Sequence, residues 1–202
     1  FMIQSFLWLM VVSFSQVSQS ENVATQTVQV FGDVSVGHPL PSFNGQEIRG
    51  TRVSSRNVLG KGHTVVISYC ATWCLPCREG LSIIEAEVQA DSTVDALYIA
   101  LDKEPIKVQR WARDLGLNSP IIVDRFQTVA KRHGVVVEGR ETVLPITFIV
   151  SQTGVVETIF TVEGEDFKTR LHSAIQSAVP ADVNDDANGE LKQDERKLEL
   201  NK

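Results

Sequence analysis

The sequence predicts an α/β protein in which a mixed β-sheet carries helices on both faces. Segments with the residue pattern of buried strands alternate along the chain with segments that have an apolar stripe at helical spacing. A short turn sequence, Gln152-Thr153-Gly154, separates the last two strands and predicts an antiparallel hairpin that closes the sheet. The chain has 202 residues, of which 43% are hydrophobic, so it is long enough for one such domain with a sizeable core.

Five segments are expected to form the strands of this sheet. Each is short and rich in β-branched or aromatic residues, which is the composition of strands that are buried on both faces. In chain order they are residues 64–69, 96–101, 121–123, 146–150 and 155–162.

Three helices are expected between and after these strands. Each shows apolar residues three, four or seven positions apart, the spacing that places side chains on one face of a helix. The stripes consist of Leu81, Ile84 and Val88 after Pro76, of Trp111 and Leu115, and of Phe167, Leu171, Ala174, Ile175 and Ala178 within residues 166–178.

The first 36 residues are expected to form a targeting segment followed by a linker to the folded domain. Residues 6–14 are almost wholly apolar and are followed by small polar residues, so residues 1–20 are expected to be a signal peptide or a retained membrane anchor. Residues 21–36 show little periodicity and are expected to be a linker or an edge strand. The protein is therefore expected in an extracytoplasmic compartment, either periplasmic or secreted.

The folded domain is expected to span residues 37–179, with a change of composition after it. Residues 181–202 hold seven acidic and four basic residues, so residues 180–202 are expected to be an acidic, disordered tail. Within this tail, residues 184–195 fit most of a calcium-binding EF-hand loop, although its first position is Asn184 rather than Asp and Pro180 interrupts the helix that should precede it. Weak calcium binding and a merely solvated tail both remain open.

Composition excludes several classes of protein. The net charge is −6 and no basic patch is evident, which argues against nucleic acid as a partner. Three cysteines are too few for a disulfide-rich scaffold. All three lie between Cys70 and Cys77, which indicates a chemical cluster.

The sequence Cys74-Leu75-Pro76-Cys77 lies between a predicted buried strand and the first turn of a predicted helix. Unpaired backbone N–H groups and the helix dipole stabilise an anion there, so Cys74 is expected to form a thiolate and to act as the nucleophile. Three positions later in the same turn, Cys77 is placed to attack a mixed disulfide on Cys74 and is expected to be the resolving thiol. Pro76 is compatible with a helix start because its missing N–H is not needed there.

A structural disulfide or half of a zinc site is the alternative for this pair. The sequence offers neither a second cysteine pair nor a histidine at metal-ligand spacing, so no metal site is expected.

The string VVISYCATWCLPCRE, the later LPITFIVSQTG and the closing helix resemble the thioredoxin-like fold, and in particular the TlpA/ResA-like thiol-disulfide oxidoreductases. This resemblance covers residues 37–179. It implies that Pro145 is a cis proline packed beside the dithiol, that Leu144 pairs with an extended client peptide, and that Trp73 supports the site. The alternative for Pro145 is that it merely begins a strand.

Several positions depart from the family pattern. Classical thioredoxins carry a buried acid where this chain has Ser68, and the family commonly carries an active-site glutamate where this chain has Gly80. Glu79 lies one position before Gly80, which on a helix turns its side chain by about 100°. Two roles are open for Glu79: it tunes the dithiol, or it only complements the helix dipole. Cys70 stands where many relatives have tryptophan, and it is either a small buried hydrophobe or a third redox thiol.

The segment 135–143, which contains Glu138, Arg140 and Glu141, is longer than the usual connection into the proline strand. It is either a loop that determines client specificity or a tolerated insertion.

The spacing of the cysteines is also compared with three other classes of protein. Cys70, Cys74 and Cys77 spell the Cys-x3-Cys-x2-Cys signature of radical S-adenosylmethionine enzymes, but the chain has too few strand-helix units for their barrel. A peroxiredoxin would need Pro-x3-Thr-x2-Cys, which no cysteine here has.

The third reading is a Sco-like copper chaperone that uses Cys70 and Cys74 with a distant histidine. His133 and His172 are the candidate ligands, but both are expected to be surface histidines.

The sequence thus predicts an extracytoplasmic thiol-disulfide oxidoreductase that needs no cofactor. Because Leu75 and Pro76 bring no charge that would overstabilise the thiolate, the protein is expected to be a reductant of protein disulfides. The resemblance implies protein thiol or disulfide clients, such as apocytochromes or other exported proteins, and a membrane thiol carrier as the electron donor. The alternative to an enzyme is a binding protein that docks peptides beside Pro145 without catalysing disulfide exchange.

Overall fold

A five-stranded mixed sheet forms the centre of the protein in the computed structural model, which describes residues 30–31 and 34–179. In spatial order its strands are β7 (Ile121–Val123), β6 (Val94–Ala100), β5 (Thr64–Cys70), β8 (Ile146–Val150) and β9 (Val156–Phe160). The first three run parallel to one another, whereas β8 is antiparallel to β5 and β9 is antiparallel to β8. The predicted strands and the closing hairpin are confirmed, with ends that differ by at most two residues.

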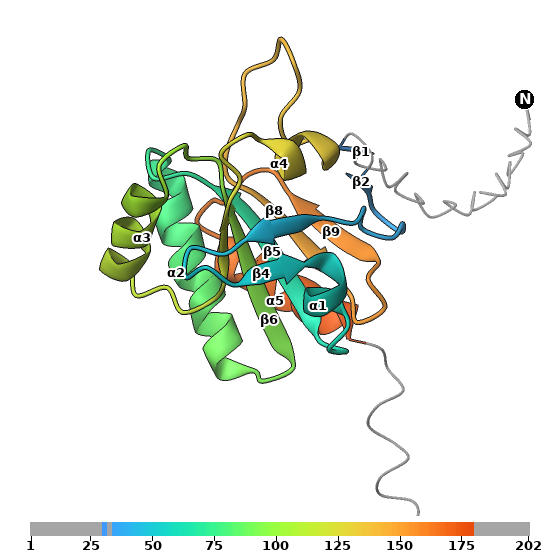
Figure 1. The fold of residues 1–202 in the computed structure, drawn as a ribbon. Helices are drawn as coiled ribbons and strands as arrows, with labels where there is room; N and C mark the ends of the chain where they lie inside the picture. The colour runs from blue at the N-terminus through green and yellow to red at the C-terminus, as the bar shows by residue number, and fades with distance from the viewer. Residues whose placement is uncertain (1–29, 32–33, 180–202) are drawn as a thin grey trace, which may run out of the picture.

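Helices cover both faces of this sheet, as predicted (Figure 1). The three expected helices, α2 (Leu75–Ala90), α3 (Pro105–Asp114) and α5 (Phe167–Ala178), contribute side chains to the core on one face. On the other face lie two short helices, α1 (Ser55–Leu59) and α4 (Thr128–Arg132), and the hairpin of β3 (Asn44–Gln46) and β4 (Arg52–Ser54). These four short elements have too few residues to show a hydrophobic period, and the sequence did not predict them.

The side chains of the central strand β5 point alternately to the two faces of the sheet, and each face has its own core. In β5 every residue is buried, because both faces of this strand are covered. Val66 and Cys70 face the core that contains α2, whereas Ile67 and Tyr69 face the core that contains α4. A continuous apolar run is the expected pattern for such a strand.

The predicted linker region contains two short strands. β1 (Val30–Phe31) pairs antiparallel with β2 (Val34–Ser35). The predicted leader 1–20, the acidic tail 180–202 and the possible calcium loop within it lie outside the described residues. Among residues 30–31 and 34–179, no helix is long and apolar enough to cross a membrane.

The topology brings four chain segments to one edge of the sheet. The parallel strands β5 and β6 end together, since Cys70 is paired with Ala100. β8 begins at this edge because Ile146 is paired with Tyr69, and β9 ends there because Phe160 is paired with Thr147. The segments that follow β5, β6 and β9 and the segment that precedes β8 therefore meet at this edge of the sheet.

Candidate active site

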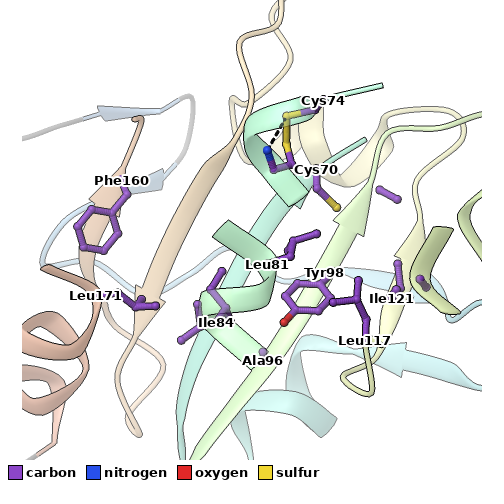
Figure 2. Close-up of a cluster of buried hydrophobic side chains, with 14 of the residues drawn as sticks. Cys70, Cys74, Leu81, Ile84, Ala96, Tyr98, Leu117, Ile121, Phe160 and Leu171 are labelled. Atoms are coloured by element: carbon purple, nitrogen blue, oxygen red, sulfur yellow. Dashed lines mark hydrogen bonds between the residues drawn. A yellow bond between two sulfur atoms is a disulfide. The ribbon is translucent and has the colours of Figure 1, made fainter. Parts of the chain in front are cut away.

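Cys74 and Cys77 form a disulfide at the start of α2, with their Cα atoms 5.4 Å apart. Cys74 is the N-cap residue of the helix, and its Sγ accepts a hydrogen bond of 3.2 Å from the backbone N–H of Cys77, drawn as a dashed line in Figure 2. Pro76 stands in the first turn, where an N–H would have no partner within the helix. A thiolate on Cys74 would be stabilised by the same N–H and by the dipole of a 16-residue helix.

The two sulfurs differ in how far a client can reach them. Cys77 is completely buried, whereas Cys74 keeps 4% of its surface accessible at the rim of the core. The neighbours of Cys74 are strongly exposed, with Trp73 at 64% and Leu75 at 75%. A protein that approaches this edge therefore meets Cys74 and the apolar side chains beside it before it meets Cys77.

The Leu144-Pro145 peptide bond is cis and lies at the same edge. Pro145 is buried immediately before β8, and Leu144 is half-buried against both cores. Because Tyr69 near the end of β5 is paired with Ile146, this loop lies beside the segment that leads into the disulfide. The backbone before Pro145 therefore lies at the same edge of the sheet as the segment that carries Cys74.

The segment between β5 and α2 is held by a carboxylate from the next strand. Asp102, which follows β6 and is only 8% exposed, accepts from the Thr72 hydroxyl at 2.6 Å and from the Thr72 backbone N–H at 3.0 Å. Both contacts end on a residue two positions before Cys74. The loop that carries the disulfide is thus tied to the sheet as well as to its own helix.

Cys70 is a buried thiol at the end of β5, just below the disulfide (Figure 2). It is completely buried, and its Sγ lies 3.9 Å from the carbonyl oxygen of Ile99. Burial raises the pKa of this thiol strongly, and the negative charges of Asp102 and Glu163 raise it further. These surroundings match the buried-hydrophobe alternative and disfavour a thiolate at this position.

Glu163 belongs to this site although no motif in the sequence points to it. It lies three residues after β9, and its Oε1 accepts a hydrogen bond of 2.8 Å from the Thr147 hydroxyl. The Thr147 and Ser68 hydroxyls are 2.9 Å apart in turn. Burial raises the pKa of Glu163 to about 7, against the opposing effects of the Thr147 hydrogen bond and of Arg170. A carboxyl group with this pKa exchanges protons near neutrality.

Glu79, which was a candidate to tune the dithiol, is exposed on the outer side of α2. The next residue, Gly80, is buried on the face that also carries Cys77. The acid beside this face is Glu163, which reaches it from another part of the chain. The sequence gives one indirect signal, which is that Ser68 and Gly80 stand at positions where related proteins carry an acidic residue. This signal does not identify the residue that supplies the acid in this chain.

The expectation of a surface position is wrong for His133. This residue is completely buried in the core that contains α4, where its ring contacts the Tyr69 hydroxyl and lies 3.0 Å from the Pro41 carbonyl oxygen. His172 is exposed as expected and contacts Glu87 at 2.8 Å. Within the described part of the chain, no group of three or more His, Cys, Asp or Glu side chains is placed to hold a metal ion, so no geometry here favours the copper reading.

A cleft of about 680 Å³ opens beside the exposed Trp73. It is lined by residues that follow β5 and β6, among them Thr72 and Asp102, and by Glu141 of the segment 135–143. This segment is the loop that projects beyond α4 in Figure 1. Its contact with the cleft beside the disulfide is consistent with the specificity-loop alternative.

Together, the mixed sheet with its closing hairpin, the disulfide at the start of α2 and the cis proline beside it define a thioredoxin-like protein of the thiol-disulfide oxidoreductase class. The sequence pattern of the AhpC/TSA family matches residues 36–159 of the chain. The chain belongs to this family, and within it to the TlpA/ResA-like thiol-disulfide oxidoreductases.

Two curated relatives illustrate the likeness, and the first is named for this activity. The thiol-disulfide oxidoreductase ResA of Geobacillus thermodenitrificans is 28% identical over 144 residues, which cover 69% of this chain and 78% of the relative. The thioredoxin-like protein YneN of Bacillus subtilis is 26% identical over 127 residues, which cover 61% of this chain and 69% of the relative.

Solved structures share the fold. A thioredoxin-family thiol:disulfide interchange protein from Chlorobium tepidum matches with a TM-score of 0.59 and 22% identity, over 69% of this chain and 94% of that protein. A secreted disulfide oxidoreductase from Mycobacterium tuberculosis matches with a TM-score of 0.57 and 15% identity, over 67% of this chain and 95% of that protein. At these identities the likeness concerns the fold.

Proposed function

We propose that this thiol-disulfide oxidoreductase reduces disulfides of client proteins outside the cytoplasm, with Cys74 as the nucleophile and Cys77 as the resolving thiol. The observation that carries the proposal is the asymmetry of the pair. Cys74 stands at the helix N-terminus with some accessible surface and accepts the Cys77 N–H, whereas Cys77 has no accessible surface. The accessible, anion-stabilised sulfur is the one suited to attack a client.

The reaction has two exchange steps. The Cys74 thiolate attacks one sulfur of a client disulfide, so that a Cys74-client bond forms and the other client sulfur leaves as a thiolate that takes up a proton. Cys77 then loses its proton and attacks the Cys74 sulfur, which releases the second client thiolate and forms the Cys74-Cys77 disulfide. Two electrons pass from the protein dithiol to the client, and a second thiol donor must then reduce the protein again.

The surroundings of the pair favour the reducing direction. Leu75 and Pro76 between the cysteines add no positive charge. A strong oxidant depends on a stabilised thiolate in its reduced form. A pair with no basic residue between its cysteines stabilises the thiolate less and is therefore suited to reduction.

Clients are proposed to bind as extended peptides along the backbone before Pro145. Hydrogen bonds between the main chain of a client and an exposed main-chain segment give affinity that does not depend on the sequence of the client. The exposed side chains of Trp73, Leu75 and Val143 provide apolar contacts around the disulfide. A membrane thiol carrier is the proposed electron donor.

The proposed location rests on the apolar run at residues 6–14 and the small polar residues after it. Exported proteins are accordingly the proposed clients.

The test is a redox titration of the purified protein in dithiol/disulfide buffers, with free thiols trapped by alkylation and each cysteine read by mass spectrometry. We expect one reversible two-electron transition confined to Cys74 and Cys77, at a potential nearer to that of thioredoxin, about −270 mV, than to that of a strong oxidant at about −120 mV. A potential near the oxidant value would overturn the reducing direction.

A trapping experiment tests the two roles separately. Cys77→Ser is expected to accumulate a mixed disulfide with a client peptide, and Cys74→Ser is expected to form none. Client trapping by Cys74→Ser, or the absence of any reversible transition in the wild type, would contradict the proposal.

A further inference from the structure

The Glu163 carboxylate lies against the helix that carries the disulfide. A Cβ atom built on Gly80 would stand 1.6 Å from Glu163 Oε2 and 2.5 Å from its Cδ. Real Cβ atoms essentially never come within 3.0 Å of another heavy atom, so with the carboxylate in this position only glycine fits at position 80. Gly80 and Glu163, which are 83 positions apart in the sequence, therefore occupy one site together.

This site adjoins the turn of α2 that carries Cys77. Gly80 follows Cys77 by three residues, and both are buried on the same face of the helix. Side chains of a helix lean toward its N-terminus, so the space that a residue-80 side chain would occupy is directed back toward Cys77. The Glu163 carboxylate fills the beginning of that space.

The two carboxylate oxygens have different surroundings. Oε1 accepts from the Thr147 hydroxyl, which holds the group in place on β8. Oε2 is buried and has no hydrogen-bond partner among the residues that the structure describes. A buried carboxylate oxygen without a donor is costly unless it receives a proton or a water-mediated contact.

The charged and titratable groups around this carboxylate come from three elements. Cys77 belongs to α2 and Cys70 to β5, and Arg170 of α5 provides the positive charge that acts on Glu163. Asp102 acts on Cys70 beside it. Glu79 is exposed on the outer side of α2. Glu163 is thus the acid that lies against the inner face of this helix turn.

We propose that Glu163 accepts the proton of Cys77 when this thiol resolves the Cys74-client mixed disulfide. The proton passes from Cys77 Sγ to the carboxylate, directly or through one water molecule. The thiolate then attacks Cys74 Sγ and the client sulfur leaves with the electron pair of the broken bond. In the reverse direction the protonated carboxyl group returns the proton as Cys77 leaves the disulfide. This inference rests on the roles proposed above for Cys74 and Cys77.

The test separates the two exchange steps by time. Reduced protein is mixed rapidly with Ellman's reagent, an aromatic disulfide that releases a coloured thiolate once when Cys74 attacks and again when Cys77 resolves the adduct. In the wild type the rate of the second release is expected to rise through about pH 7, where Glu163 loses its proton. In Glu163→Gln this inflection is expected to disappear, and the second release at pH 7.5 is expected to slow about 10-fold while the first changes less than about 2-fold.

Three further variants provide the controls. Glu165→Gln removes the same charge from an exposed position in the same loop and is expected to behave as the wild type. Gly80→Ala places a methyl group where Oε2 lies and is expected to slow the second release as Glu163→Gln does. The double variant Gly80→Glu with Glu163→Ala supplies a carboxylate from the helix itself and is expected to restore the inflection, which a merely structural role of Glu163 would not explain.

An unchanged pH profile of the second release in Glu163→Gln would overturn the inference. The roles of the cysteines would stand in that case, provided that Cys77→Ser loses only the second release and Cys74→Ser loses both. A second release that persists in Cys77→Ser would instead overturn the proposed function, and the inference would fall with it.

Discussion

Asp102 binds Thr72 through both of its carboxylate oxygens, one on the side-chain hydroxyl and one on the backbone N–H. The two residues lie on segments that follow neighbouring parallel strands, so their contact joins the ends of β5 and β6 just before the disulfide. The position of Cys74 therefore depends on the sheet as well as on α2.

Asp102→Asn is expected to lower the free energy of unfolding by about 1–2 kcal/mol, because both Thr72 contacts lose their ionised acceptor and only one of the two amide atoms can still accept a hydrogen bond. Chemical denaturation measures this change. The exposed Asp114 of α3 offers a matched control, and Asp114→Asn is expected to change the stability by less than about 0.5 kcal/mol. Equal losses in the two variants would show that the Thr72 contacts do not stabilise the fold.

Cys70→Ala is expected to leave thiol-disulfide exchange unchanged within about 2-fold, because a completely buried thiol with a strongly raised pKa forms almost no thiolate. Removing the sulfur from the core is expected to cost about 1–2 kcal/mol of stability. Exchange kinetics and denaturation measure the two effects.

Alkylation checks the same conclusion in the wild type. Cys70 is expected to react only after unfolding, whatever the redox buffer. Modification of Cys70 in the folded protein would instead favour the third-redox-thiol alternative.

Glu163→Gln is expected to abolish a pH dependence of stability in the acid range. Burial raises the pKa of Glu163 from its usual value near 4.5 to about 7, so between these values the folded protein holds a proton that the unfolded chain releases. The wild type is therefore expected to lose stability as the pH rises from about 4.5 to about 7, by up to about 3 kcal/mol. Above this window, Glu163→Gln should be more stable than the wild type.

Thermal and chemical unfolding at several pH values measure this difference. Glu165→Gln, whose carboxyl group is exposed, should follow the wild type at every pH. Parallel stability curves for the wild type and Glu163→Gln would mean that Glu163 titrates at its ordinary pKa in the folded protein.

Trp73→Ala is expected to slow exchange with a peptide disulfide about 10-fold and to leave exchange with dithiothreitol within about 2-fold, because a large exposed aromatic side chain contacts a client and not a small dithiol. Its 64% exposure predicts a change in stability below about 0.5 kcal/mol. Ile106→Ala removes a side chain of 62% exposure from α3 and serves as the control. Equal slowing with both substrates would assign Trp73 to the chemistry of the cysteines instead.

Local patterns were sufficient for the architecture and for the reactive pair. The run of β-branched residues in β5 and the apolar stripe of α2 each depend on neighbours within one element, and a period of two or of 3.6 residues is visible in the sequence alone. Cys74 and Cys77 share one helical turn, so their proximity also follows from spacing. The sequence by itself therefore determined the fold class, the helix that carries the pair and the chemistry of two neighbouring thiols.

The tertiary structure decided what surrounds that pair. His133 follows two basic residues at a helix end, a pattern of exposed positions, yet the packing of α4 against the sheet buries its ring completely. Asp102 and Glu163 reach the site only because β6 and β9 end at the edge where β5 ends and β8 begins. Such contacts join residues that are tens of positions apart and leave no periodic trace in the sequence. Hence Glu163 could be found only from the folded chain, in which the missing side chain of Gly80 leaves space for its carboxylate.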